Sequence, residues 1–118
     1  MSVRGVGMGI CLVAALIAAA QIRPAGAQFM QEMSGSMERM DRQMAKAPMN
    51  GDVDHDFAFM MIPHHQGAID MAKAELIYGQ DPVMRRLAQE ILVDQQSEID
   101  AMRLWLGKTT AGNSQKEK

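Results

Sequence analysis

Residues 60–72 read MMIPHHQGAIDMA, and this stretch places two adjacent histidines within one or two helical turns of three methionines. Imidazole and thioether groups are ligands that suit copper, and thioether in particular suits Cu(I). On a helical wheel centred on His64, several side chains fall within about 60° of it. They are Phe57, Met60, Met61, Ala68, Met71, Glu75 and Tyr78. The stretch therefore predicts a helix with candidate copper ligands along one face.

This helix has clear boundaries in the sequence. Asp52 or Asp54 can cap its start, and it runs to about Tyr78, where Gly79 is a natural stop. Pro63 lies inside the helix and removes one backbone hydrogen bond, so we expect a kink one turn before the histidines.

Two further helices flank it. The first covers about residues 29–45 and carries methionines at alternating spacings of three and four: Met30, Met33, Met37, Met40 and Met44. The last opens at Asp81-Pro82 and runs to about Leu106, with Gly107 as its stop. Its apolar face comprises Met84, Leu87, Ala88, Ile91, Leu92, Ile99, Met102 and Leu106.

No stretch alternates with the period of a strand, so the sequence predicts an all-α fold. We expect an antiparallel bundle of three helices, open to completion by dimerisation. The predicted organisation is a signal peptide over 1–27, a methionine-rich helix and turn over 28–51, a histidine and methionine helical hairpin over 52–107, and a disordered tail over 108–118.

The signal peptide is predicted from Arg4, an apolar segment over residues 6–20 and the small residues 25–27, with cleavage after Ala27. As a membrane anchor, that segment would reach only about 22 Å of a hydrocarbon core of about 30 Å. Cleavage would remove Cys11, the only cysteine, and leave 10 basic against 14 acidic residues. We therefore expect an exported, periplasmic protein with no disulfide and no nucleic-acid partner.

The candidate metal ligands are ranked by their shared helical face. His64 is the strongest candidate, because Met60 and Met61 lie one turn before it and Met71 lies two turns after it. His65 points about 100° away and could serve the flank or a second metal. Further candidates are His55, which neighbours two aspartates, and the five methionines of the first helix. Gln95 or Glu98 could hydrogen-bond the other nitrogen of a metal-bound histidine.

A packing role for the methionines stays open, because methionine is a flexible core filler and a regular stripe usually packs. Enzyme functions lack support: Glu-x-x-His, His-Glu-x-x-His and Gly-x-Ser-x-Gly do not occur, and no cysteine remains after cleavage. A small copper oxidoreductase would also lack the Cys-His-His set of an electron-transfer site.

The motif at residues 56–72, followed by Ile91, Gln95-Gln96-Ser97-Glu98-Ile99 and Met102, resembles a family of exported bacterial proteins long known only as a domain of unknown function. Its better-understood members are CopM-like periplasmic copper-binding proteins. The resemblance covers about residues 52–107 and implies a ferritin-like helical architecture, copper binding and copper tolerance. It marks Met61, His64, His65 and Met71 as candidate ligands.

The leading hypothesis is an exported protein that sequesters or carries Cu(I) without turnover. The alternative is a helical interaction module whose methionine stripes serve only as packing surface. Because the first predicted helix is too short to cover both longer ones, we also expect a homodimer with contacts through the last helix, and the methionine stripe is a second candidate contact.

Overall fold

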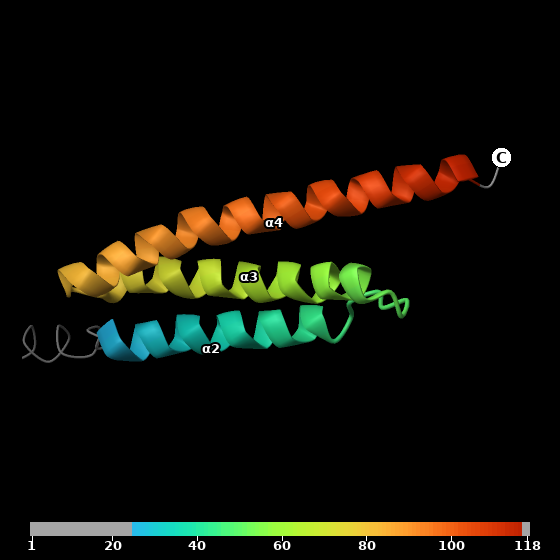
Figure 1. Cartoon of the computed structure of the whole chain (residues 1–118). Helices are drawn as coiled ribbons and strands as arrows, with labels where there is room; N and C mark the ends of the chain where they lie inside the picture. Colours follow the sequence, from blue (N-terminus) through green and yellow to red (C-terminus); the bar gives the residue numbers. More distant parts are fainter. Residues whose placement is uncertain (1–24, 117–118) are drawn as a thin grey trace, which may run out of the picture.

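The computed structural model describes residues 25–116, and it describes side chains up to residue 108. The chain forms three helices, α2 (Ala25–Met44), α3 (Val53–Tyr78) and α4 (Pro82–Lys116), and neighbouring helices run antiparallel (Figure 1). The prediction of an all-α fold with three helices is confirmed. No helix in this part of the chain is long and apolar enough to span a bilayer. Most of the predicted signal peptide, residues 1–24, lies outside the described residues.

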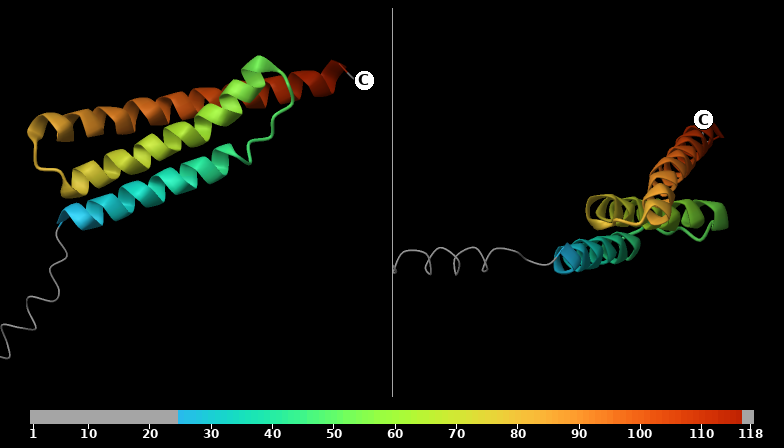
Figure 2. Two further views of the ribbon diagram at one scale, coloured as in Figure 1. Left: turned by 90° about the horizontal axis from the view of Figure 1, so that it is seen from below. Right: turned by 90° about the vertical axis from the view of Figure 1, so that its left-hand side faces the viewer.

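Helix α3 lies between the other two helices (Figures 1 and 2). It packs against α2 and against α4, whereas α2 and α4 make no contact with each other in the described part of the chain. The helices therefore form a layer with α3 in the middle, rather than a bundle closed around a central axis. Each side of this layer leaves part of α3 uncovered.

Small side chains on α3 allow both neighbours to approach closely. The residues buried on α3 are Ala58, Pro63, His65, Gly67, Ile69, Ala72 and Ala74. On a helical wheel they fall into two groups, one toward α4 that includes His65 and Ile69 and one toward α2 that includes Gly67 and Ala74. Opposite the first group, Ile99 of α4 has no exposed surface. The core thus consists of two seams, one on either side of α3.

The turn before α3 is held by carboxylates. Asp52 caps the helix by accepting a hydrogen bond from the backbone of His55 at 2.9 Å. Asp56 accepts from the backbone nitrogens of Asn50 at 2.8 Å and Gly51 at 3.0 Å. The Asn50 hydrogen bond is the main reason that the pKa of Asp56 lies below its usual value, and the imidazole of His55 adds to it. Gly51 has a positive φ of 89°, which favours glycine.

The turn after α3 is held by a cation. The Arg85 guanidinium donates to the carbonyls of Leu76 at 2.6 Å and Gly79 at 2.9 Å, which are groups that the end of a helix leaves without partners. Asp81 caps α4 by accepting from the backbone nitrogens of Val83 and Met84. The two predicted boundaries here, Gly79 and Asp81-Pro82, are confirmed.

Two predicted features differ from the structure. Helix α4 does not stop at Gly107 but continues to Lys116, so the prediction of disorder over 108–118 is wrong for residues 108–116. Glycine inside a helix costs only about 1 kcal/mol, and no proline follows to end the helix. Helix α2 also begins four residues before Phe29. Pro63 lies within α3, which stays one continuous helix and buries this proline.

Gly67 is the point of closest approach between α2 and α3. A Cβ atom added there would lie 2.7 Å from the sulfur and 3.0 Å from the Cβ of Met40. We therefore expect Gly67→Ala to push α2 away and lower the free energy of unfolding by about 1–3 kcal/mol. Gly107→Ala is the control, because an added Cβ there meets nothing within 4 Å. The control should raise helix stability by about 0.5–1 kcal/mol. Urea unfolding followed by circular dichroism measures both changes, and a stabilising Gly67→Ala would contradict this packing.

Candidate functional site: a methionine and histidine face

His64 lies at the middle of the uncovered strip of α3. Its side chain is exposed, while Met60, Met61 and Met71 are half-buried around it. On the helical wheel, the buried α3 residues that face α4 begin about 80° from His64 on one side. The buried residues that face α2 begin about 60° from His64 on the other side. His64 therefore points out of the layer between its two neighbours, as the shared face in the sequence predicts.

The methionine stripe of α2 borders the same side of the layer. The opposite edge of α2 is fixed by Arg39, whose guanidinium lies 3.6 Å from Asp70, a residue on the far side of α3 from His64. The methionines occupy the other edge. Met33, Met40 and Met44 are half-buried against α3, whereas Met30 and Met37 are exposed. The stripe thus serves packing on one flank and stays accessible on the other.

Helix α4 borders this side with its own thioethers. Met102 and Trp105 line a groove of about 430 Å³ together with Phe57, a close neighbour of His64 on the α3 wheel. Met84 precedes Met102 by about five helical turns and shares its direction. We call this side the methionine–histidine face. Its methionines come from all three helices: Met30 and Met37 of α2, Met60, Met61 and Met71 of α3, and Met84 and Met102 of α4. Met33, Met40 and Met44 pack in the adjoining seam between α2 and α3.

The opposite side of the layer carries ion pairs, together with exposed apolar side chains such as Ile77 and Leu104. Asp70 there lies within 3.7 Å of Lys73 as well as pairing with Arg39. His55 also belongs to this side: its Nδ1 lies 3.1 Å from Asp56, and its ring packs 4.5 Å from that of Phe59. The structure therefore does not bring His55 to the methionine–histidine face, and the prediction of His55 as an extra ligand of that cluster is not supported by its position.

His65 makes the least ordinary contact in the molecule. It is 8% exposed, and its Nε2 lies 2.6 Å from the carboxylate of Glu98 on α4. Its Nδ1 is buried without a hydrogen-bond partner, the one such side-chain nitrogen or oxygen in the described part of the chain. The prediction that Glu98 could support a histidine is consistent with this contact. Gln95, the other candidate, is half-buried but makes no contact with either histidine within the described residues.

The two histidines lie side by side with different environments. Their ring centroids are 5.9 Å apart and the rings meet edge to face. One imidazole is open to solvent and the other is held between α3 and α4. Sequence periodicity ranked His65 below His64 because His65 lies on the flank of the methionine face. It named Gln95 or Glu98 as a possible partner of a metal-bound histidine, but it could not show which of the two histidines α4 would reach.

The donor set limits which metals this face could hold. Within residues 25–108, no three or more histidine, cysteine, aspartate or glutamate side chains form a group able to hold a metal ion. A site here would therefore need thioether sulfur in addition to imidazole. Sulfur ligands select soft ions such as Cu(I), whereas Mg²⁺ and Ca²⁺ require several oxygens.

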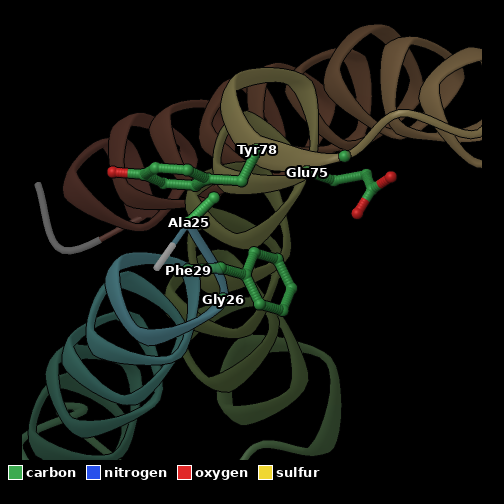
Figure 3. Close-up of a pocket in the computed structure, with 6 residues that line it drawn as sticks. Ala25, Gly26, Phe29, Glu75 and Tyr78 are labelled. Atoms are coloured by element: carbon green, nitrogen blue, oxygen red, sulfur yellow. The ribbon is translucent and has the colours of Figure 1, made fainter. Parts of the chain in front are cut away.

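A small cavity of about 200 Å³ opens where the start of α2 meets the end of α3 (Figure 3). The ring of Phe29 packs against that of Tyr78 at a centroid distance of 6.4 Å. The carboxylate of Glu75 points away from both rings in this view. Glu75 is half-buried and therefore can reach water, and it lies at the end of the face rather than beside the histidines.

Comparisons with known proteins identify the family. A family model described as a domain of unknown function, DUF305, matches residues 14–106, which is most of the chain. An uncharacterised protein of Acanthamoeba polyphaga mimivirus is 41% identical over 49 residues, which cover 42% of this chain and 32% of that protein. The match thus spans about a third of the relative's length, and neither comparison carries a description of activity. With most of its length matched by this family model, the chain belongs to the DUF305 family.

Proposed function

We propose that this protein binds Cu(I) on the methionine–histidine face and sequesters or carries it without turnover. The observation that carries the proposal is that methionines from all three helices lie along the side of the layer on which His64 is exposed. Soft thioether sulfur binds Cu(I) in preference to hard cations. In this proposal the protein is exported to the periplasm after cleavage behind Ala27, and its binding of copper contributes to copper tolerance, as its resemblance to CopM-like proteins implies.

The environment of His65 supports a histidine contribution to the site. A neutral imidazole that donates from Nε2 to the Glu98 carboxylate keeps its lone pair on Nδ1. Metal-binding histidines commonly donate their second nitrogen to a carboxylate in this way, which fixes the ring and makes it a better ligand. The unpartnered Nδ1 of His65 fits that arrangement. His64 with Met60, Met61 and Met71 would supply the accessible part of the site.

The alternative function is a helical interaction module in which the methionines only pack. Met40 supports this alternative locally, because its side chain fills the space that Gly67 leaves open on α3. Packing does not account for Met30 and Met37, which are 57% and 42% exposed on the same face. Exposed thioethers add little to a core, so copper binding explains more of the stripe than packing alone.

Metal preference tests this proposal. We expect Cu(I) and Ag(I) to bind far more tightly than Mg²⁺, Ca²⁺ or Mn²⁺, because the face offers sulfur and imidazole rather than clustered carboxylates. The measurement is an anaerobic titration of the purified protein with Cu(I) against a competing chelator, together with thermal melts in each of the other ions. Failure to compete for Cu(I) at any ratio would favour the interaction module. Preferential stabilisation by Ca²⁺ or Mg²⁺ would also contradict the proposal.

A further inference from the structure

The methionine–histidine face is an apolar surface of a size that folded proteins do not ordinarily leave exposed to solvent. Phe57 is 60% exposed near the start of the α3 part of this face, and Leu87 of α4 is 46% exposed on the same side. No helix in the described part of the chain covers this side, because α2 and α4 do not meet above α3. Stable domains bury such a face against a second layer. The described helices provide one layer only.

We infer that a second copy of this chain covers the methionine–histidine face, so that two three-helix layers stack face to face in a two-fold dimer. The 26 residues of α3 give a face about 39 Å long. Three helices spaced about 9 Å apart are about 28 Å wide, so the face measures about 1,000 Å². A stable protein–protein interface needs about 800 Å² from each partner. The available area is therefore sufficient.

The distribution of charge leaves the centre of the face open to a second copy. In a two-fold dimer each surface patch meets its own copy, so a patch rich in one sign of charge would repel itself. The Arg39–Asp70 and Lys73–Asp70 pairs lie on the opposite side of the layer. Glu98, which borders the face, contacts His65, whereas Asp54 and Glu75 lie ten and eleven residues from His64, toward the two ends of α3. The centre of the face can therefore meet itself through thioether and apolar side chains, which adapt to one another readily.

The position of His64 locates the two-fold axis. His64 lies near the midpoint of α3, and α3 is the middle helix of the layer. A two-fold axis that lies in the plane of the interface and passes through the centre of the face therefore brings the His64 side chains of the two copies close together. If copper binds there as proposed above, ligands from both copies meet at one place and the metal strengthens the dimer. This last step rests on the proposed function, whereas the dimer itself does not.

Engineered cysteines test the dimer without copper. In the full chain carrying Cys11→Ser, no other cysteine is present, so an introduced one reports its own position. We expect His64→Cys to form a disulfide-linked dimer rapidly under mild oxidation, because its copies lie across the axis. Lys73→Cys is the matched control, since Lys73 is also exposed and lies on the opposite side of α3. Equal cross-linking at both positions would overturn the inference.

Sedimentation gives a second, independent measurement. We expect the Cys11→Ser protein to sediment as a dimer at micromolar concentration, and Phe57→Glu to shift it at least tenfold toward monomer by placing two like charges at the interface. A monomer without copper would overturn the inference while leaving copper binding intact. A dimer that fails to bind Cu(I) would instead overturn only the proposed function. A monomer whose His64→Cys thiol becomes reactive only after residues 1–24 are removed would assign the face to that segment and also overturn the inference.

Discussion

Replacing His64 by alanine is expected to weaken Cu(I) binding by about tenfold or more, whereas His55→Ala should leave it unchanged. Even loss of a partner that only supports a metal ligand costs about 10- to 100-fold in affinity, so loss of a ligand should cost at least the lower value. His64 lies at the middle of the methionine–histidine face, and His55 lies on the opposite side of α3 against Phe59. Competition titration of the two variants in parallel measures the difference.

The pH dependence of the same binding separates the two ligand types. Imidazole must be neutral to hold a metal, so its contribution should fall as the pH is lowered from 7 to 5. Thioether sulfur does not titrate, and part of the Cu(I) affinity should therefore survive at pH 5. In His64→Ala the loss of affinity on acidification should be smaller than in the parent protein. If His64→Ala and His55→Ala both left the Cu(I) affinity unchanged, the cluster around His64 would not be the copper site.

The sequence predicted local structure well because local signals are strong in this chain. Asp52, Gly79 and Asp81 mark helix boundaries through their own hydrogen bonds or conformations, and each marks a boundary in the structure. The face around His64 follows from helical periodicity alone, which is a property of one helix. Gly107 is the exception, because a lone glycine weakens a helix without being sufficient to end it.

The arrangement of the helices could not be predicted in the same way. Periodicity shows which residues of α3 share a face, but it does not show which neighbour covers that face. In the structure α2 and α4 take the flanks and leave the His64 side open. The pairing of His65 with Glu98 joins residues 33 positions apart and depends on how α4 docks. The ranking of His64 above His65 as a metal ligand therefore rested on the periodicity of α3 alone and took no account of the neighbouring helices.

The methionine stripe of α2 shows the same limit of prediction from sequence, because only some of its side chains are buried. Five methionines at regular spacing predict a continuous apolar seam, yet Met30 and Met37 remain exposed while Met33, Met40 and Met44 pack against α3. A single neighbouring helix covers only part of such a stripe. The exposed methionines are therefore the ones that a metal or a second copy of the chain could reach.

The seam between α3 and α4 should carry much of the stability. Ile99 has no exposed surface and is the largest fully buried side chain among the described residues. Ile99→Ala would remove three buried carbon atoms and leave a cavity in the seam between α3 and α4. Such substitutions cost about 2–5 kcal/mol. For a folded unit of about 90 residues, the size of the described part of the chain, this loss corresponds to a fall in Tm of more than about 10 °C.

Leu104 provides the matched control for this prediction. It lies on the same helix, has the same number of carbon atoms and is 61% exposed. Leu104→Ala should change the free energy of unfolding by less than about 0.5 kcal/mol, because it creates no cavity. Thermal and urea unfolding of both variants, in metal-free buffer, measures the contrast. A small effect of Ile99→Ala would mean that α4 does not dock on α3 through this residue, and the contact between Glu98 and His65 would then lose its structural basis, since Glu98 directly precedes Ile99.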